Sequence, residues 1–245
     1  MNTTVIATIA GKDLRQIGHR RTVLVPLIAF PLLIAIGLPL IVFRAEHRSG
    51  GIPANVVTTL LGAFVVIFVI GAAILPTVIA SSSLVGEKVE RSLEPLLATP
   101  ATDTEILLGK AAAATLPPLA ALWIGAAVFM VWADLLTHHQ LGYAYFPTGQ
   151  SLVTVLLVLP LAAILSVQYS VLVSARVTDI RAAQQLAGLI VLPFAALYLL
   201  AELRMFSLDG TGVAVLCIVL AVIDAALFGV TRATFRREEI LTRWK

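Results

Sequence analysis

The sequence predicts an all-α protein that crosses a membrane six times. Of its 245 residues, 59% are hydrophobic and only 13% are charged, and the mean hydropathy is +0.99. Soluble domains are about 45–50% apolar and about 25% charged. Several runs of roughly 20 residues lack any charge, and a helix of that length can cross about 30 Å of hydrocarbon. These runs are expected to be helical, because backbone groups in lipid must hydrogen-bond within their own segment.

The chain begins with an amphipathic segment, residues 1–22, which we expect to lie in the membrane interface as a helix. Its basic face holds Lys12, Arg15 and His19, whereas Asp13 interrupts the apolar face. The apolar face comprises Val5, Ile6, Ile9, Ala10, Leu14 and Ile17. A basic amphipathic helix before a span is typical of interfacial anchors. It could also present Lys12 and Arg15 to a cytoplasmic partner, and the two roles are compatible.

Residues 23–245 contain six apolar segments, which we expect to form one transmembrane domain. The segments are Val23–Phe43, Val56–Ala80, Ala111–Ala133, Ser151–Val173, Ala182–Ala201 and Val213–Val230. The fifth is unusual, since its charge-free part, Leu186–Ala201, contains Pro193 and is short for a complete crossing.

The distribution of Lys and Arg predicts that both termini are cytoplasmic. Positively charged loops stay on the cytoplasmic side of a membrane. With the N-terminus inside and six crossings, all of the 17 Lys and Arg residues except Arg44, Arg48 and Arg204 fall on that side. The net charge of +3 then reflects topology and attraction to anionic lipid headgroups, so no nucleic-acid partner is expected.

The charged segment between the second and third apolar segments, residues 84–105, has the pattern of a short amphipathic helix. Apolar residues at helical spacing are Val85, Val89, Leu93 and Leu96, and charged residues on the other side are Glu87, Glu90, Arg91 and Glu94. Pro95 should end or kink this helix. Thr102 and Glu105 match the capping box that opens a further helix. We therefore expect an ordered cytoplasmic element, with a solvated connector as the alternative.

Two apolar segments carry small residues at four-residue spacing, which let helices approach closely within one chain or between chains. These faces are Ala162-Ser166-Ser170-Ser174 and Cys217-Ala221-Ala225-Gly229. Asp224 is the one acid well inside an apolar segment, and Gln168 and Tyr169 are polar neighbours of the first face. An acid in a membrane is a functional hypothesis by default. A structural hydrogen bond from Asp224 to Gln168, Tyr169 or another subunit and a place in an ion or proton path both stay open.

The loop Asp134–Gln150 carries no Lys or Arg but holds three aromatic residues, Tyr143, Tyr145 and Phe146. Aromatic side chains gather at membrane interfaces. We expect them to anchor the loop there, on the outer side.

The sequence gives no sign of chemistry performed by this chain. It lacks a phosphate-binding loop of the form Gly-x-x-x-x-Gly-Lys-Ser/Thr, so we expect it neither to bind nor to hydrolyse ATP. Its single cysteine, Cys217, can form neither an internal disulfide nor a cysteine-based metal site. No catalytic residue, metal or cofactor of its own is expected.

The central segment resembles a signature of the ABC-2 type transporter permeases. The likeness covers Gly86-Glu87-Lys88-Val89-Glu90-Arg91-Ser92-Leu93-Glu94-Pro95-Leu96-Leu97-Ala98-Thr99-Pro100 and Glu105-Ile106-Leu107-Leu108-Gly109-Lys110. Chain length, six segments and the N-terminal amphipathic helix agree with it. In that family this segment includes a coupling helix that docks on a separate ATPase. The resemblance implies the same role for Gly86, Glu87, Arg91 and Glu94, with Lys12 and Arg15 beside them.

The resemblance also implies an assembly and a location. Two copies of a cytoplasmic ATPase would carry ATP and Mg²⁺, two permease subunits would form a dimer, which we expect to be a homodimer, and the complex would lie in the cell membrane as an exporter of an amphiphile or ion. A short re-entrant hairpin over Phe194–Phe206 is implied before the last span. The competing interpretation is an ATP-independent ion-coupled carrier or channel that uses Asp224.

Overall fold

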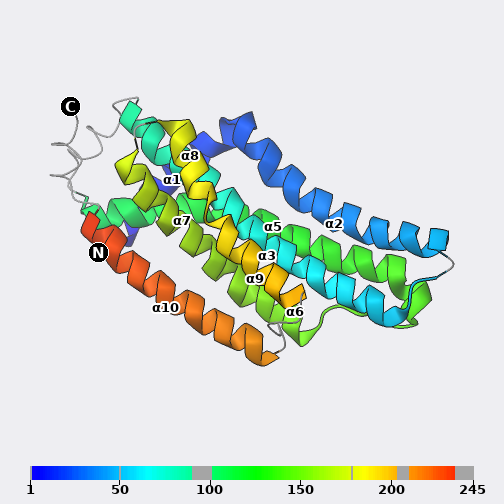
Figure 1. Ribbon diagram of the computed structural model, residues 1–245. Helices are drawn as coiled ribbons and strands as arrows, with labels where there is room; N and C mark the ends of the chain where they lie inside the picture. The colour runs from blue at the N-terminus through cyan, green and yellow to red at the C-terminus, as the bar shows by residue number, and fades with distance from the viewer. Residues whose placement is uncertain (1, 50, 90–100, 178, 203–209, 235–245) are drawn as a thin grey trace.

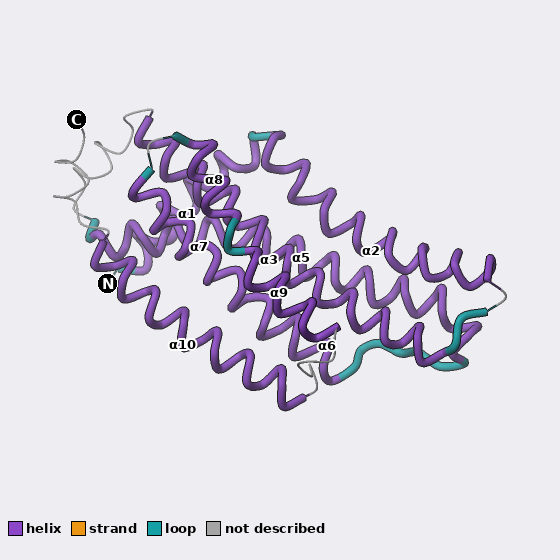
Figure 2. Tube along the Cα trace, in the orientation of Figure 1, coloured by secondary structure: helices purple, strands orange, loops and turns teal. Residues whose placement is uncertain are grey.

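The computed structural model describes residues 2–49, 51–89, 101–177, 179–202 and 210–234. These residues are helical almost throughout, and the long helices lie side by side as an elongated bundle (Figures 1 and 2). The helices are α1 (Thr3–His19), α2 (Arg21–Ser49), α3 (Ala54–Val89), α5 (Asp103–Leu141), α6 (Gly149–Val153), the π-helical turn η1 (Thr154–Val158), α7 (Leu159–Arg176), α8 (Ile180–Gly188), α9 (Val191–Glu202) and α10 (Gly210–Thr234).

Six stretches of the described chain are long and apolar enough to cross a membrane, which confirms the predicted all-α, multi-pass fold. They are Arg21–Ala45, Ala54–Ser81, Asp103–Leu141, Gly149–Ser174, Arg181–Leu200 and Gly210–Arg232. The third span, helix α5, extends beyond the predicted apolar segment Ala111–Ala133 at both ends. At 1.5 Å per residue α5 measures roughly 58 Å, so it extends well beyond about 30 Å of hydrocarbon.

The core of the bundle surrounds α3, which packs against α2, α5, α7, α8 and α9. Leu61, Phe68, Leu122 and Phe129 are among its fully buried side chains. The rings of Phe68 and Phe129 meet edge to face, with centroids 5.7 Å apart. In contrast, large apolar side chains such as Leu135, 67% exposed, cover the outside of the helices, as expected for surfaces that face lipid.

The small-residue face of the fourth span packs within the chain, whereas that of the sixth is exposed, so its predicted role in packing is open only between subunits. Ser166 and Ser170 are fully buried against α3, and their hydroxyls donate to the carbonyl oxygens of Ala72 at 3.1 Å and Thr77 at 3.4 Å. Small side chains let the two backbones come close enough for these bonds. On α10, Ala221, Ala225 and Gly229 are exposed within the single chain.

The fifth span is broken into α8 and α9 at Leu189 and Ile190. Pro193 is the third residue of α9, where its missing N–H has no partner within the helix in any case. Of the segment expected to form a re-entrant hairpin, residues 194–202 continue α9 as helix, and residues 203–206 lie outside the described part of the chain.

The loop between α5 and α6 folds back onto the bundle, which corrects the expectation that its aromatic residues are interfacial anchors. The Asp134 carboxylate accepts the backbone N–H groups of Tyr145 at 3.0 Å and Phe146 at 3.1 Å. Phe146 is buried, with its ring 5.6 Å from that of Phe129. Only Tyr143 is well exposed, so it alone fits the anchoring role.

Candidate functional site

Helix α1 crosses one end of the bundle and is fixed to the first turns of α5 (Figure 1). The predicted capping box is present, since the Thr102 hydroxyl accepts the Glu105 N–H and the Glu105 carboxylate accepts the Thr102 N–H at 2.9 Å. The other oxygen of Glu105 accepts the backbone N–H of Asn2 at 2.5 Å. One carboxylate therefore caps α5 and holds the start of α1.

A buried ion pair joins the two helices further along. Lys110 Nζ lies 3.4 Å from Asp13 Oδ2, and their side chains are 3% and 6% exposed. Burying charges is costly unless they are paired. The pair explains why an acid interrupts the apolar face of α1: that face lies against α5, and Asp13 meets a cation there.

Gly109 allows the close contact between these helices. A Cβ atom at this position would lie 2.9 Å from Cβ and Cγ2 of Ile9 and 3.1 Å from the carbonyl oxygen of Ile6. Only a residue without a side chain fits this spacing. Gly109 and Lys110 thus have structural roles that the sequence pattern alone did not assign.

The residues predicted to couple to an ATPase lie partly within the described chain. Lys12 and Arg15 are exposed on α1, and with His19 they form a basic face that points away from the bundle. Gly86 and Glu87 are in the last turn of α3, so the predicted coupling helix begins as a continuation of the second span. Arg91 and Glu94 lie outside the described residues.

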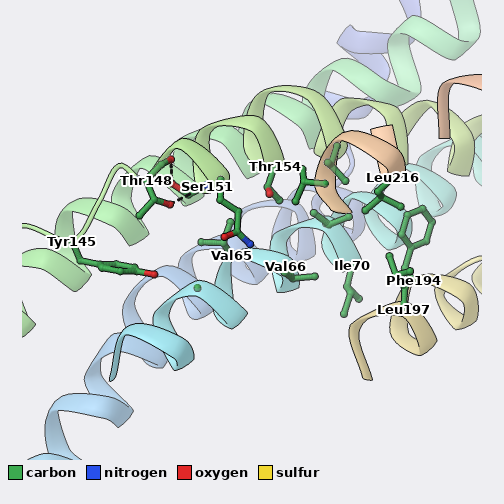
Figure 3. A pocket seen from close by; sticks show the side chains of 15 residues that line it. Val65, Val66, Ile70, Tyr145, Thr148, Ser151, Thr154, Phe194, Leu197 and Leu216 are labelled. Carbon is green, nitrogen blue, oxygen red and sulfur yellow. Dashed lines mark hydrogen bonds between the residues drawn. The ribbon is translucent and has the colours of Figure 1, made fainter. Parts of the chain in front are cut away.

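A pocket lies towards the opposite end of the bundle, between α3, α6, η1, α9, α10 and the loop that precedes α6 (Figure 3). The space between these elements, including the part that is open to the outside, amounts to about 610 Å³. Its apolar lining comprises Gly62, Val65, Val66, Val69, Ile70, Val158, Phe194, Leu197, Val213 and Leu216. Its polar lining comprises Tyr145, Thr148, Gln150, Ser151 and Thr154. No pattern in the sequence predicted this pocket.

The π-helical turn η1 places Thr154 and Val158 in the pocket wall. In this turn the Leu159 N–H bonds to the Thr154 carbonyl, five residues back. The Val155 carbonyl would need the N–H of residue 160, which is a proline and has none. Trp123 on α5 supplies the missing donor, with Nε1 2.9 Å from the Val155 oxygen. π-Helical turns are frequent at functional sites.

The hydroxyl groups on the polar side of the pocket are not all engaged. Thr148 and Ser151 bond to each other's backbone in a capping box that starts α6. The hydroxyls of Tyr145 and Thr154 have no hydrogen-bond partner within the described part of the chain. Burial, and to a smaller extent Tyr143, raises the pKa of Tyr145, so its hydroxyl remains protonated at neutral pH.

The predicted intramembrane polar residues are buried but not hydrogen-bonded to one another. Both carboxylate oxygens of Asp224 and Oε1 of Gln168 lack a hydrogen-bond partner among the described residues. Tyr169, the third predicted residue, is partly buried. Of the alternatives left open for Asp224, a hydrogen bond to Gln168 or Tyr169 is therefore not formed among the described residues.

Among the residues that the structure describes, no cluster of three or more His, Cys, Asp or Glu side chains could hold a metal ion. No known family model matches the chain, and a search of curated proteins finds no significant similarity. The likeness to the ABC-2 permeases stays a prediction from the sequence.

Proposed function

We propose that the chain is the membrane subunit of an ATP-driven transporter, an exporter of an amphiphile or ion, whose ATPase is a separate protein. The observation that carries the proposal is the patterned segment from Gly86 to Lys110. Support for its docking role comes from its position: it leaves α3 at Val89 and returns to the capped start of α5, beside which α1 is fixed. A push on this segment would act directly on the second and third spans.

The proposed assembly has two permease subunits and two copies of the ATPase, which hold the ATP and Mg²⁺. The exposed small-residue face of α10 supports the pairing of subunits, because a second helix could approach it closely. The basic face of α1 supports a cytoplasmic location for its end of the bundle, and so for the ATPase. We propose the cell membrane as the location.

The test is purification in mild detergent, followed by mass spectrometry and measurement of ATP hydrolysis. We expect the wild type to retain a protein with a phosphate-binding loop in equal amounts, and the charge reversal Glu87→Arg to lose it. Arg44→Glu, a reversal near the end of α2 that lies far from α1 along the helix, is the matched control and should retain it. If Glu87→Arg retains the ATPase at the wild-type ratio, the docking role is wrong.

The second candidate is an ion-coupled carrier or channel. The carboxylate of Asp224, which has no hydrogen-bond partner among the described residues, favours it. A buried acid without a polar partner is costly in a membrane unless it binds an ion or a proton. Vesicles that contain the chain alone separate the two candidates. Flux driven by an ion gradient without ATP, and abolished by Asp224→Asn, would favour the carrier.

A further inference from the structure

The pocket has two unlike walls, and this asymmetry constrains what it can bind. Side chains of α3, α9 and α10, including Ile70, Phe194 and Leu216, form an apolar wall (Figure 3). The loop and the turn η1 contribute the polar wall, with Tyr145 and Thr154 as its unengaged hydroxyls. A ligand that satisfies both walls has an apolar body and a polar group at one side.

No described residue that lines the pocket carries a charge. A charged ligand group would leave water without gaining a counterion there, which is unfavourable in an apolar site. A neutral polar group loses less on leaving water and can bond to the two hydroxyls, each of which can donate and accept. The polar part of the ligand is therefore expected to be uncharged.

The pocket lies next to the part of the bundle that is most exposed to lipid. One of its walls is formed by α9 and α10, which belong to the two spans with the smallest buried share, 17% each. The outer surfaces of these helices carry exposed apolar residues, such as Leu199 and Ile218. A molecule dissolved in lipid can thus meet the outer side of this wall without crossing water.

We propose that this pocket binds an uncharged amphiphile of the diacylglycerol type, with a hydroxyl, ester or amide group held by Tyr145 and Thr154. Its apolar chains would lie along Ile70, Phe194 and Leu216. The proposal adds the class of cargo to the proposed transport function. The interpretation of the pocket as a cargo site rests on that function. Binding itself needs no ATPase.

The experiment uses the full chain in lipid nanodiscs with a photoreactive diacylglycerol and, as its charged match, phosphatidic acid with the same photoreactive chains. Labelled peptides are located and quantified by mass spectrometry. We expect diacylglycerol to label α3 around residues 65–70 and α9 around residues 194–197, and phosphatidic acid to label them at least fivefold less.

Two variants each remove one hydroxyl at nearly constant shape, Tyr145→Phe and Thr154→Val. Each should weaken labelling by about 2- to 10-fold, the range for one lost hydrogen bond. Val66→Trp should abolish it by filling the pocket. Thr115→Val is the matched control, because the Thr115 hydroxyl bonds within its own helix at 2.7 Å and lies outside the pocket. Size-exclusion profiles verify that the variants fold.

Equal labelling of wild type, Tyr145→Phe and Thr154→Val would overturn the proposal, since the label would then report lipid around the bundle. Equal or stronger labelling by phosphatidic acid would overturn it too, because the site would not select an uncharged group. Neither result would affect the conclusion of the Glu87→Arg experiment on ATPase docking. Conversely, selective binding without a copurifying ATPase would keep the site and reject the ATP-driven function.

Discussion

Of the two tryptophans Trp123 and Trp132 on α5, only Trp123 has a hydrogen-bond partner for its indole N–H among the described residues. Trp123 Nε1 donates to the Val155 carbonyl, which η1 and Pro160 leave without a backbone donor. Nε1 of Trp132 is buried and has no partner within the described residues. An unsatisfied buried polar group costs free energy, so the same substitution should act differently at the two positions.

We predict that Trp123→Phe lowers the free energy of unfolding by about 1–3 kcal/mol more than Trp132→Phe does, because only the former leaves a carbonyl unsatisfied. Both substitutions remove similar ring area, so Trp132→Phe controls for lost packing. Titration of the purified protein with a denaturing detergent measures both values. Equal losses would mean that the bond to Val155 contributes nothing to stability.

A second prediction concerns the buried pair of Asp13 and Lys110. Lys110→Met deprives the Asp13 carboxylate of its buried cation and should destabilise the protein by about 3–5 kcal/mol. The double variant Asp13→Leu with Lys110→Met removes both charges and should regain most of that loss. The same detergent titration tests this pair. A double variant no more stable than Lys110→Met would show that the charges are not coupled.

At the scale of elements, α1 is held to α5 by shape as well as by charge. Because Gly109 faces Ile6 and Ile9, a methyl group added there must push α1 away. Gly11 lies within α1 itself, and a Cβ at that position would meet nothing within 4 Å. The two glycines thus separate the effect of helix propensity from that of helix contact.

We predict that Gly109→Ala loosens α1, at a cost of about 1–3 kcal/mol, and that Gly11→Ala stabilises it by up to about 1 kcal/mol. Hydrogen–deuterium exchange of the α1 amides should rise in the first variant and fall or stay constant in the second. Adding Ile9→Ala to Gly109→Ala removes the contact with Ile9 Cγ2 but keeps those with Ile9 Cβ and the Ile6 carbonyl, so exchange should slow only in part. Full recovery of slow exchange would show that crowding of these two remaining atoms is not the cause.

The elements were predictable where a local pattern decides them. Hydrophobic length gave the six spans, and Thr102 with Glu105 gave the start of α5. In contrast, the turn η1 depends on Pro160 together with a donor from Trp123, which is 32 residues away from Val155 along the chain. The pocket likewise brings together four separate stretches of the chain, and no local pattern records such contacts. Asp13 was visible as an anomaly, but its partner was not.

For the whole molecule, the pocket and the end that carries the basic face are connected by one uninterrupted helix. Helix α3 contributes Val65, Val66, Val69 and Ile70 to the pocket and continues to Val89, where the segment proposed to dock on an ATPase begins. Its 36 residues measure roughly 54 Å. A displacement at one end can therefore reach the other through one continuous helix, in which Pro76 is the one proline between the pocket and Val89. For an ATPase to act in this way, the α1 end must face the cytoplasm.

We predict that the α1 end is cytoplasmic, because nearly all Lys and Arg residues belong to that side of the six-span topology. Cysteine labelling tests this in a Cys217→Ala background, which removes the natural thiol. An impermeant maleimide should label Tyr143→Cys, in the exposed part of the α5–α6 loop, on intact cells. Gln16→Cys on α1 should react only after the membrane is made permeable. The reverse pattern would place Lys12 and Arg15 outside, and docking of a cytoplasmic ATPase at that end would then be excluded.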